Sequence, residues 1–322
     1  MRALVCRGYG DPEQLQVEDV EIPVPKEEQV LIKVIAAGVS YVDSMMIRDL
    51  HQNKHPVPFV PGTELTGRVV AAHPGSRFAE GDRVAALVWD GGHAEYAVAN
   101  ENEVFALPEG LDPVTVAACL SVYLTSGLAL RHRAGLQQGE MLLVLGAAGG
   151  TGLAAVDIGH ALGARVLAAA SNPEKLALAD QRGAEWLINY HREDLKEALR
   201  RTTPDGIDVV FDPVAGPLFE AANGALAWNG RYLIVGFTGG MIPQFAANRL
   251  LVKNRSALGF SIRHYIRNDN DKLQSEAQHL FTGLLNSRLH PHVSAAGNLH
   301  EAPGMIRRIL DRKATGKMVV VV

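Results

Sequence analysis

LLVLGAAGGTGLAAVDIGHALGARVLAAASN, residues 142–172, is the stretch that decides the fold of this chain. An apolar run ends at Leu145, glycines recur at every third position from Gly146 to Gly152, and a helical run follows. A strand, a tight turn and a helix in this order place backbone N–H groups where a pyrophosphate can bind. The alternative is a close crossing of helix and sheet that uses small residues only for packing. We expect the first unit of a nucleotide-binding sheet.

Apolar runs alternate with helical segments from about residue 138 onward. The strand-like runs are EMLLVLG, RVLAAAS, EWLINY, GIDVVFDPV, RYLIVGF and SALGFS. Between the second and third runs, Asn172 can cap a helix, Pro173 suits its first position and Gly183 can end it. This alternation predicts the α/β class, with a doubly wound parallel sheet over residues 122–259.

The chain on either side of this sheet has a different pattern. Short β runs separated by Pro and Gly, from LQVEDVEIP to AEYAVAN, predict a compact β-barrel-like domain before residue 122. After Phe260, two helical stretches near 272–287 and 301–312 precede a last strand, KMVVVV. We expect this tail to pack on the first domain, so that residues 1–121 and 260–322 form one domain.

Composition restricts the class of protein. The chain has 322 residues, is 47% hydrophobic and carries a net charge of -4, which is typical of a globular protein of two domains. The sequence has no stripe of aromatic and basic residues, so we expect no nucleic-acid binding. The apolar runs are interrupted before the roughly 18 residues that span a bilayer. The N-terminus becomes charged too soon for a secretory signal, so we expect a cytoplasmic protein.

The turn after the second strand lacks an acidic residue. An Asp or Glu there would bind both ribose hydroxyls of NAD and would repel a 2′-phosphate. Here Ser171 and Asn172 end the strand, Lys175 follows, and Tyr190 ends the third strand. A neutral turn beside a cation favours NADPH, with Tyr190 on the adenosine phosphate; a solvated helix face is the alternative for Lys175.

Five motifs together resemble a known family. They are PGTELTGRVVAAHPGSRFAEGDRVAAL, GGHAEYAVA, GAAGGTG, FDPVAG and ATGKMVVVV. In this combination and order the chain resembles the zinc-free quinone oxidoreductases of the medium-chain dehydrogenase/reductase family, which are related to zeta-crystallin. The resemblance implies a GroES-like catalytic domain made from both chain ends, an inserted Rossmann domain, and a nicotinamide in the cleft between them.

The positions of the catalytic zinc ligands in metal-dependent relatives carry hydroxyls in this chain. By the resemblance, Ser40 stands where those relatives have Cys, Thr63 where they have His, and Ser121 near the third ligand. Hydroxyls are poor substitutes for thiolate and imidazole on zinc. Cys6 and Cys119 lie far apart without a CxxC spacing, so we expect no metal.

A site without a Lewis acid suits acceptors that delocalise charge, such as a quinone or a conjugated enone. We expect Ser40, Tyr41 and Thr63 to contact the acceptor, with Tyr41 or solvent as the proton donor. Asp43 is expected to anchor the loop.

The predicted cofactor contacts lie on the glycine-rich loop, at the carboxyl ends of the parallel strands and, by the resemblance, near the nicotinamide and the phosphate end. The full set is Thr125, Gly146, Ala147, Ala148, Gly149, Gly150, Thr151, Gly152, Ser171, Lys175, Tyr190, Val214, Gly236, Phe237, Thr238, Phe260, Ser261 and Lys317.

The sequence therefore predicts an NADPH-dependent quinone oxidoreductase that works without zinc. An enoyl or 2-alkenal reductase of the same fold and a non-catalytic NADPH-binding protein stay open as alternatives. The last Rossmann strand, SALGFS, would be an exposed edge in a monomer. The resemblance implies that such strands pair across a twofold axis, so we expect a homodimer.

Overall fold

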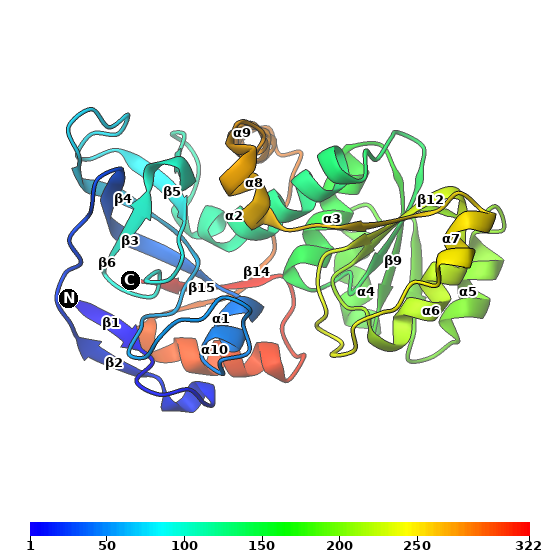
Figure 1. Cartoon of the computed structure of the whole chain (residues 1–322), viewed down its shortest axis with the longest axis horizontal. Coiled ribbons are helices and arrows are strands. Elements are labelled where there is room, and N and C mark those ends of the chain that lie inside the picture. Colours follow the sequence, from blue (N-terminus) through cyan, green and yellow to red (C-terminus); the bar gives the residue numbers. More distant parts are fainter. The chain divides into compact units, whose positions relative to one another are not determined.

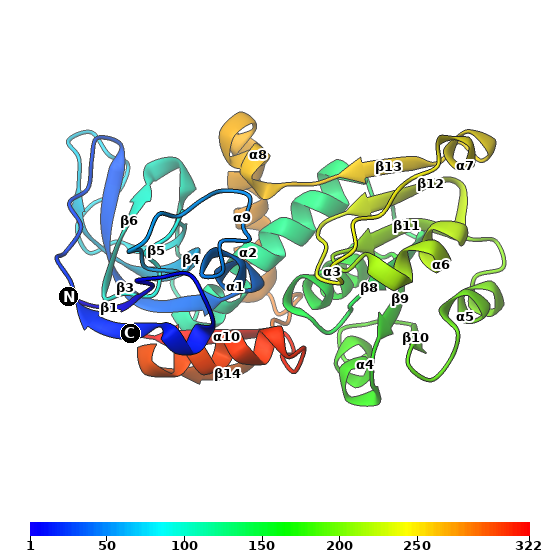
Figure 2. The same ribbon diagram turned by 60° about the horizontal axis from the view of Figure 1, so that its bottom comes forward.

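The alternating apolar runs form a six-stranded sheet in the computed structural model, which describes all 322 residues. Its strands are β8 (Met141–Leu145), β9 (Arg165–Ala170), β10 (Trp186–Asn189), β11 (Ile207–Asp212), β12 (Leu226–Ile234) and β13 (Ser256–Gly259). They lie in the order β10-β9-β8-β11-β12-β13, and each neighbouring pair is parallel (Figure 2). The order reverses between β8 and β11, where doubly wound sheets bind ligands.

Helices connect these parallel strands and follow the last of them. The connecting helices are α3 (Gly150–Ala161), α4 (Pro173–Asp180), α5 (Leu195–Thr202), α6 (Phe219–Gly224) and α7 (Ala247–Val252), with a short 3-10 turn, η4 (Gly216–Leu218). After β13 come α8 (Ile262–Asn268) and α9 (Asn270–Leu285). Strand β8 is buried along its whole length, as expected for a central strand covered on both faces. The predicted α/β class and doubly wound parallel sheet are confirmed.

The rest of the chain builds a second sheet and a small antiparallel pair. The strands are β1 (Arg2–Val5), β2 (Gln16–Asp19), β3 (Gln29–Val39), β4 (Glu64–Ala72), β5 (Arg83–Leu87), β6 (Tyr96–Asn100), β7 (Val104–Ala106), β14 (Val293–Gly297) and β15 (Lys317–Val321). The long strand β3 pairs with β4, with β6 through its first half and with the C-terminal β15 through its second half. Alternate residues Val30, Ile32 and Val34 point into the core.

Few helices belong to this β-rich part. They are α1 (Tyr41–Met46), α10 (Ala302–Leu310) and the 3-10 turns η1 (Pro12–Gln14), η2 (Glu101–Glu103) and η5 (Leu299–Glu301). Helix α10 packs beside α1, and the two chain ends lie in this same part (Figure 1). The expected return of the C-terminal tail is seen in the pairing of β15 with β3.

The chain divides into two compact units. Unit 1 comprises residues 1–121, 277–285 and 291–322, and unit 2 comprises residues 122–276 and 286–290. The first boundary coincides with the expected one, whereas residues 260–276 and 286–290 fall in unit 2 rather than with the tail. Contacts explain this: the carboxylate of Glu276 pairs with Arg131 at 3.3 Å, and the backbone N–H of His290 donates to buried Asp157.

A long apolar helical stretch runs from the last residues of unit 1 into unit 2, and the sequence analysis did not predict it. Helix α2 (Pro113–Gly127) continues into the π-helical turn η3 (Leu128–Arg133), and together they are long and apolar enough to cross a membrane. The expectation that every apolar run is interrupted before about 18 residues is wrong for this stretch. A Cβ on Gly127 would lie 1.9 Å from Oε1 of Glu276, so glycine serves close packing inside the helix. The stretch is mostly buried within the protein, which accounts for its hydropathy, and a cytoplasmic location stays a prediction.

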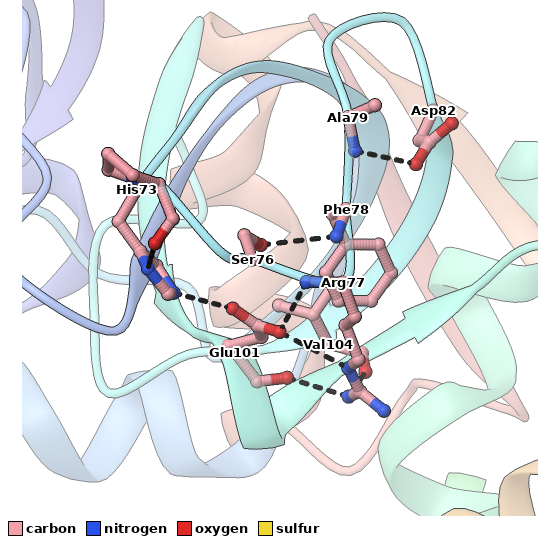
Figure 3. A network of polar contacts seen from close by, with 9 residues as sticks. His73, Ser76, Arg77, Phe78, Ala79, Asp82, Glu101 and Val104 are labelled. Atoms are coloured by element: carbon pink, nitrogen blue, oxygen red, sulfur yellow. Dashed lines mark hydrogen bonds and ion pairs between the residues drawn. The ribbon is translucent and has the colours of Figure 1, made fainter.

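The connection from β4 to β5 is held by a polar network around Glu101 (Figure 3). One carboxylate oxygen lies 2.7 Å from Nε2 of His73, and the other accepts the backbone N–H of Arg77. The Arg77 guanidinium donates to the carbonyls of Glu101 and Val104. The loop is thereby fastened to the start of β7.

This network predicts a pH dependence of stability. The hydrogen bond to Glu101 is the main cause that raises the pKa of His73 above its ordinary value of 6.5. A group whose pKa is raised by folding stabilises fully below its unfolded pKa, and this stabilisation is lost as pH rises through the folded pKa. We expect the free energy of unfolding to fall as pH rises above 6.5, and His73→Gln to reduce that slope. Urea unfolding across this range would contradict the prediction if the variant kept the wild-type slope.

Candidate active site

The glycine-rich turn after β8 has the backbone shape that the sequence predicts. Gly146 adopts a φ of +62°, a region that favours glycine. A Cβ on Gly152 would lie 2.2 Å from the carbonyl oxygen of Gly146, so only glycine allows α3 to begin this close to the turn. Gly149 is the N-cap of α3 and supplies no capping side chain. The first N–H groups of α3 are therefore oriented to bind an anion such as a pyrophosphate.

The predicted adenosine end lies next to this turn in unit 2. Strand β9 ends at Ala170, and Nζ of Lys175 lies 3.3 Å from Oγ of Ser171. The backbone N–H of Tyr190 donates to the carbonyl of Ala170 at 3.2 Å, which brings the end of β10 beside the same turn. Asn172 caps α4 through the N–H of Lys175. Ser171, Lys175 and Tyr190 are thus gathered at one edge of the sheet.

The loop after β11 is organised by a carboxylate that the sequence analysis did not single out. One oxygen of Asp212 accepts the N–H groups of Val214 and Ala215, both at 2.7 Å. Its other oxygen accepts the hydroxyl of Tyr232 at 2.5 Å. Burial raises the pKa of Asp212, against the lowering effect of these hydrogen bonds. Ala215 is held at a φ of +56°, a strained value for a residue with a side chain.

The loops after β12 and β13 join the one after β11. The N–H of Gly239 donates to the carbonyl of Val214 at 2.7 Å, and the hydroxyl of Thr238 donates to that of Pro213. Gly236 and Phe237 lie in the loop between β12 and this turn, and Phe237 is exposed. Phe260 follows β13 and donates its N–H to Ile234. All predicted loop residues therefore lie at the carboxyl ends of the strands, where doubly wound sheets bind ligands.

Helix α2 contributes one further residue to this region. The hydroxyl of Ser126 donates to the carbonyl of Thr151 in the first turn of α3 at 2.9 Å. Thr125, the predicted nicotinamide contact, is its immediate neighbour and is half-buried. The sequence analysis missed Ser126 because only the fold brings α2 to the glycine-rich turn.

In unit 1, Asp43 holds the predicted acceptor residues in place. Its carboxylate is fully buried and accepts the N–H and the hydroxyl of Ser40, at 2.6 and 3.1 Å. It also accepts the N–H of Gly62, the residue before Thr63, at 3.1 Å. Tyr41 begins α1 directly after Ser40. Asp43 is therefore an anchor, as the sequence indicates, and it brings Ser40, Tyr41 and Thr63 close to one another.

A second buried carboxylate follows Thr63. Oε1 of Glu64 lies 2.5 Å from Nζ of Lys317, and Oε2 accepts the N–H of Ser121 at 2.8 Å. Glu64 is completely buried and Lys317 nearly so. The ammonium of Lys317, predicted as a cofactor contact, thus has Glu64 as its partner, and the pair fixes the start of β15 against β4.

Ser40, Thr63 and Ser121 do not belong to a group of side chains typical of a zinc site. Nowhere in the chain do three or more His, Cys, Asp or Glu side chains gather in a way that could hold a metal ion. Cys6 and Cys119 are both buried thiols.

Two family models and several known proteins match this chain. The family model described as the GroES-like domain of alcohol dehydrogenase matches residues 26–109, and the one described as zinc-binding dehydrogenase matches residues 150–278. Quinone oxidoreductase-like protein 2 of Bos taurus is 36% identical over 326 residues, covering 99% of this chain and 92% of the relative. Human quinone oxidoreductase is 31% identical and covers 99% and 97%.

Solved structures of similar proteins support the same family. The quinone oxidoreductase of Thermus thermophilus, described alone and with NADPH, is 35% identical, has a TM-score of 0.86 and covers 100% of both chains. A mycobacterial protein in complex with NADPH is 26% identical, has a TM-score of 0.93 and also covers 100% of both. The predicted family, the oxidoreductase class and, for the family, the cofactor NADPH are confirmed. This chain belongs to the quinone oxidoreductase family of the medium-chain dehydrogenases/reductases.

Proposed function

We propose that this chain is an NADPH-dependent oxidoreductase that reduces a quinone or another conjugated carbonyl compound without zinc. One observation carries the cofactor assignment: Nζ of Lys175 lies 3.3 Å from Oγ of Ser171 directly after β9, where an NAD-specific turn would place a carboxylate. The relatives described with NADPH support the same assignment. When bound, NADPH would supply the hydride.

The acceptor assignment rests on the hydroxyls of unit 1. By the resemblance to the family, Ser40, Thr63 and Ser121 stand at or near the positions that carry zinc ligands in metal-dependent relatives, and hydroxyls bind zinc poorly. Without a Lewis acid, reduction is easiest for an acceptor that spreads the new negative charge over a conjugated system. Thr63 would donate a hydrogen bond to the acceptor beside Ser40, whose own hydroxyl proton is directed at Asp43, and Tyr41 or water is the simplest source of the proton.

Turnover with and without a metal chelator tests this function. We expect steady NADPH oxidation by a simple quinone or enone, unchanged by chelation, and no oxidation of simple alcohols.

Lys175→Ala should weaken NADPH binding by about tenfold or more, because it removes a charge-assisted hydrogen bond worth roughly 1.5–3 kcal/mol, and should leave NADH binding nearly unchanged.

Lys196→Ala is the matched control for Lys175→Ala. Lys196 is an exposed lysine on another helix of unit 2, α5, and its loss should change neither dissociation constant. Tighter binding of NADH than NADPH by the wild type, or turnover that requires zinc, would contradict the proposal.

We also propose that two copies of the chain associate through the β13 edge of the Rossmann sheet. Strand β13 ends the sheet, and the neighbouring segments expose large apolar side chains. These are Trp228, Met241, Ile242, Leu251 and Val252. Unpaired strand edges and apolar patches of this kind are typically covered by a partner, and a second copy matches the resemblance.

Light scattering tests the dimer. We expect a dimer mass for the wild type and a monomer mass for Leu251→Asp, because a buried, unpaired carboxylate would oppose association. Leu187→Asp is the control, since Leu187 is exposed on β10 at the opposite edge of the sheet. A wild-type monomer at micromolar concentration would refute the proposal.

A further inference from the structure

A short loop of unit 2, residues 213–216, follows β11 at the carboxyl edge of the Rossmann sheet. Strand β11 lies between β8 and β12 there (Figure 2). A Cβ on Gly146 would lie 2.7 Å from Cγ2 of Val214, so the side chain of Val214 packs directly on the glycine-rich turn after β8. On the other side, the carbonyl of Val214 accepts the N–H of Gly239, in the loop after β12, at 2.7 Å. The loop therefore lies between two segments that carry predicted cofactor contacts.

The backbone of this loop is strained at Ala215. Its φ is +56° and its ψ is -133°, a combination that residues with a side chain rarely adopt. Ala215 is fully buried, and the next residue, Gly216, has a φ of +59°, which costs glycine little. Strained residues of this kind persist only where neighbouring groups hold them, and they cluster at ligand-binding sites. The conformation of Ala215 therefore requires a group that holds it.

Asp212 is that group. One oxygen of its carboxylate accepts the N–H groups of Val214 and Ala215, both at 2.7 Å. The other oxygen accepts the hydroxyl of Tyr232, and Asp212 is 1% exposed. Hydrogen bonds to a charged oxygen are about twice as strong as those between neutral groups. The two N–H bonds thus oppose the relaxation of Ala215.

The hydroxyl that binds Asp212 is held rigidly in the core of unit 2. Tyr232 is fully buried, and its ring packs edge-on against Phe219 and Phe245, with 5.3 Å between centroids in each pair. Its strand, β12, pairs with β11 along the residues that lead to Asp212. Because the sheet and the core fix this side of the contact, loss of the carboxylate would release the loop rather than the strand.

Asp157 is a comparable carboxylate of unit 2 that holds no such loop. It is 2% exposed and accepts the hydroxyl of Tyr123 and the N–H of His290, both at 2.6 Å. Neither partner has a positive φ, and neither lies in a loop at the carboxyl end of a parallel strand. Asp157 joins α3 to α2 and to the segment after α9. Only Asp212 combines this bonding with a strained residue beside the glycine-rich turn.

We propose that Asp212 is a positioning residue for NADPH. It keeps Ala215 in its strained conformation and so holds Val214 against the glycine-rich turn, in the arrangement that receives the dinucleotide. This inference rests on the proposed function, in which Val214 and the turn contact the cofactor. Asp212 is buried and acts through Val214, which is half-buried and has part of its surface accessible.

Dissociation constants for NADPH and steady-state kinetics of variants test the proposal. We expect Asp212→Ala to raise both Kd and KM for NADPH by about tenfold or more, because the loop loses hydrogen bonds to a charged group. At saturating NADPH, kcat should stay within about twofold of the wild type, as for a change that weakens ground-state and transition-state binding equally. If Asp212→Ala does not fold, Asp212→Asn replaces it. Its amide oxygen still accepts both N–H groups but carries no charge, so Kd should rise by about threefold or more.

Adding Ala215→Gly to the Asp212 variant separates positioning from stability. Glycine adopts a positive φ without strain, so the loop should keep its shape without the charged carboxylate. We expect the double variant to recover most of the lost affinity for NADPH. A carboxylate that only stabilised the fold would not produce this recovery in the folded protein.

Asp157→Ala is the matched control. It should lower the free energy of unfolding in urea, because it leaves a buried hydroxyl and a buried N–H without their acceptor, and should keep Kd for NADPH within about twofold of the wild type. A wild-type Kd in the folded Asp212 variant, an equal loss of affinity in Asp157→Ala, or no recovery in the double variant would overturn the proposal. Failure of the proposed function itself is distinct, because the wild type would then not oxidise NADPH with any acceptor.

Discussion

The close approach of α3 to the turn after β8 is the constraint on which the rest of unit 2 depends. It requires glycine at residue 152, because a side chain there would collide with the carbonyl of Gly146. It also leaves the helix N-terminus without a capping side chain, so the first N–H groups need another acceptor. We propose that a dinucleotide pyrophosphate satisfies that need and that the neutral turn at Ser171 favours NADPH over NADH.

Unit 1 depends in a similar way on two buried carboxylates. Asp43 ties Ser40 to Gly62, and Glu64 ties Ser121 to Lys317. Buried carboxylates are stable only when their oxygens are hydrogen-bonded or paired, and both conditions are met here. The backbone at residues 40, 62 and 121 is therefore held in place, and the hydroxyls nearby suit hydrogen bonding to an acceptor rather than binding of zinc.

Local patterns were sufficient to predict the glycine-rich turn and the six parallel strands, whereas the role of the hydroxyls at residues 40, 63 and 121 came from the resemblance to the family and stays a prediction. The contacts that hold the site together could not be predicted, because they join residues distant in the chain. Tyr232 meets Asp212 only because β12 lies beside β11, and Lys317 meets Glu64 across 253 positions. The expected boundary at residue 260 differs from the observed one for the same reason: the carboxylate of Glu276 contacts Arg131.

The central claim is that this chain delivers a hydride from NADPH directly to a conjugated acceptor without a metal. Its most direct test is the reduction of a conjugated enone by NADPH that carries deuterium at the transferred C4 position, with a chelator present. The account predicts that the product retains the deuterium on its β-carbon and that NADPH oxidation shows a primary isotope effect. A product without deuterium, or a reaction abolished by chelation, would contradict it.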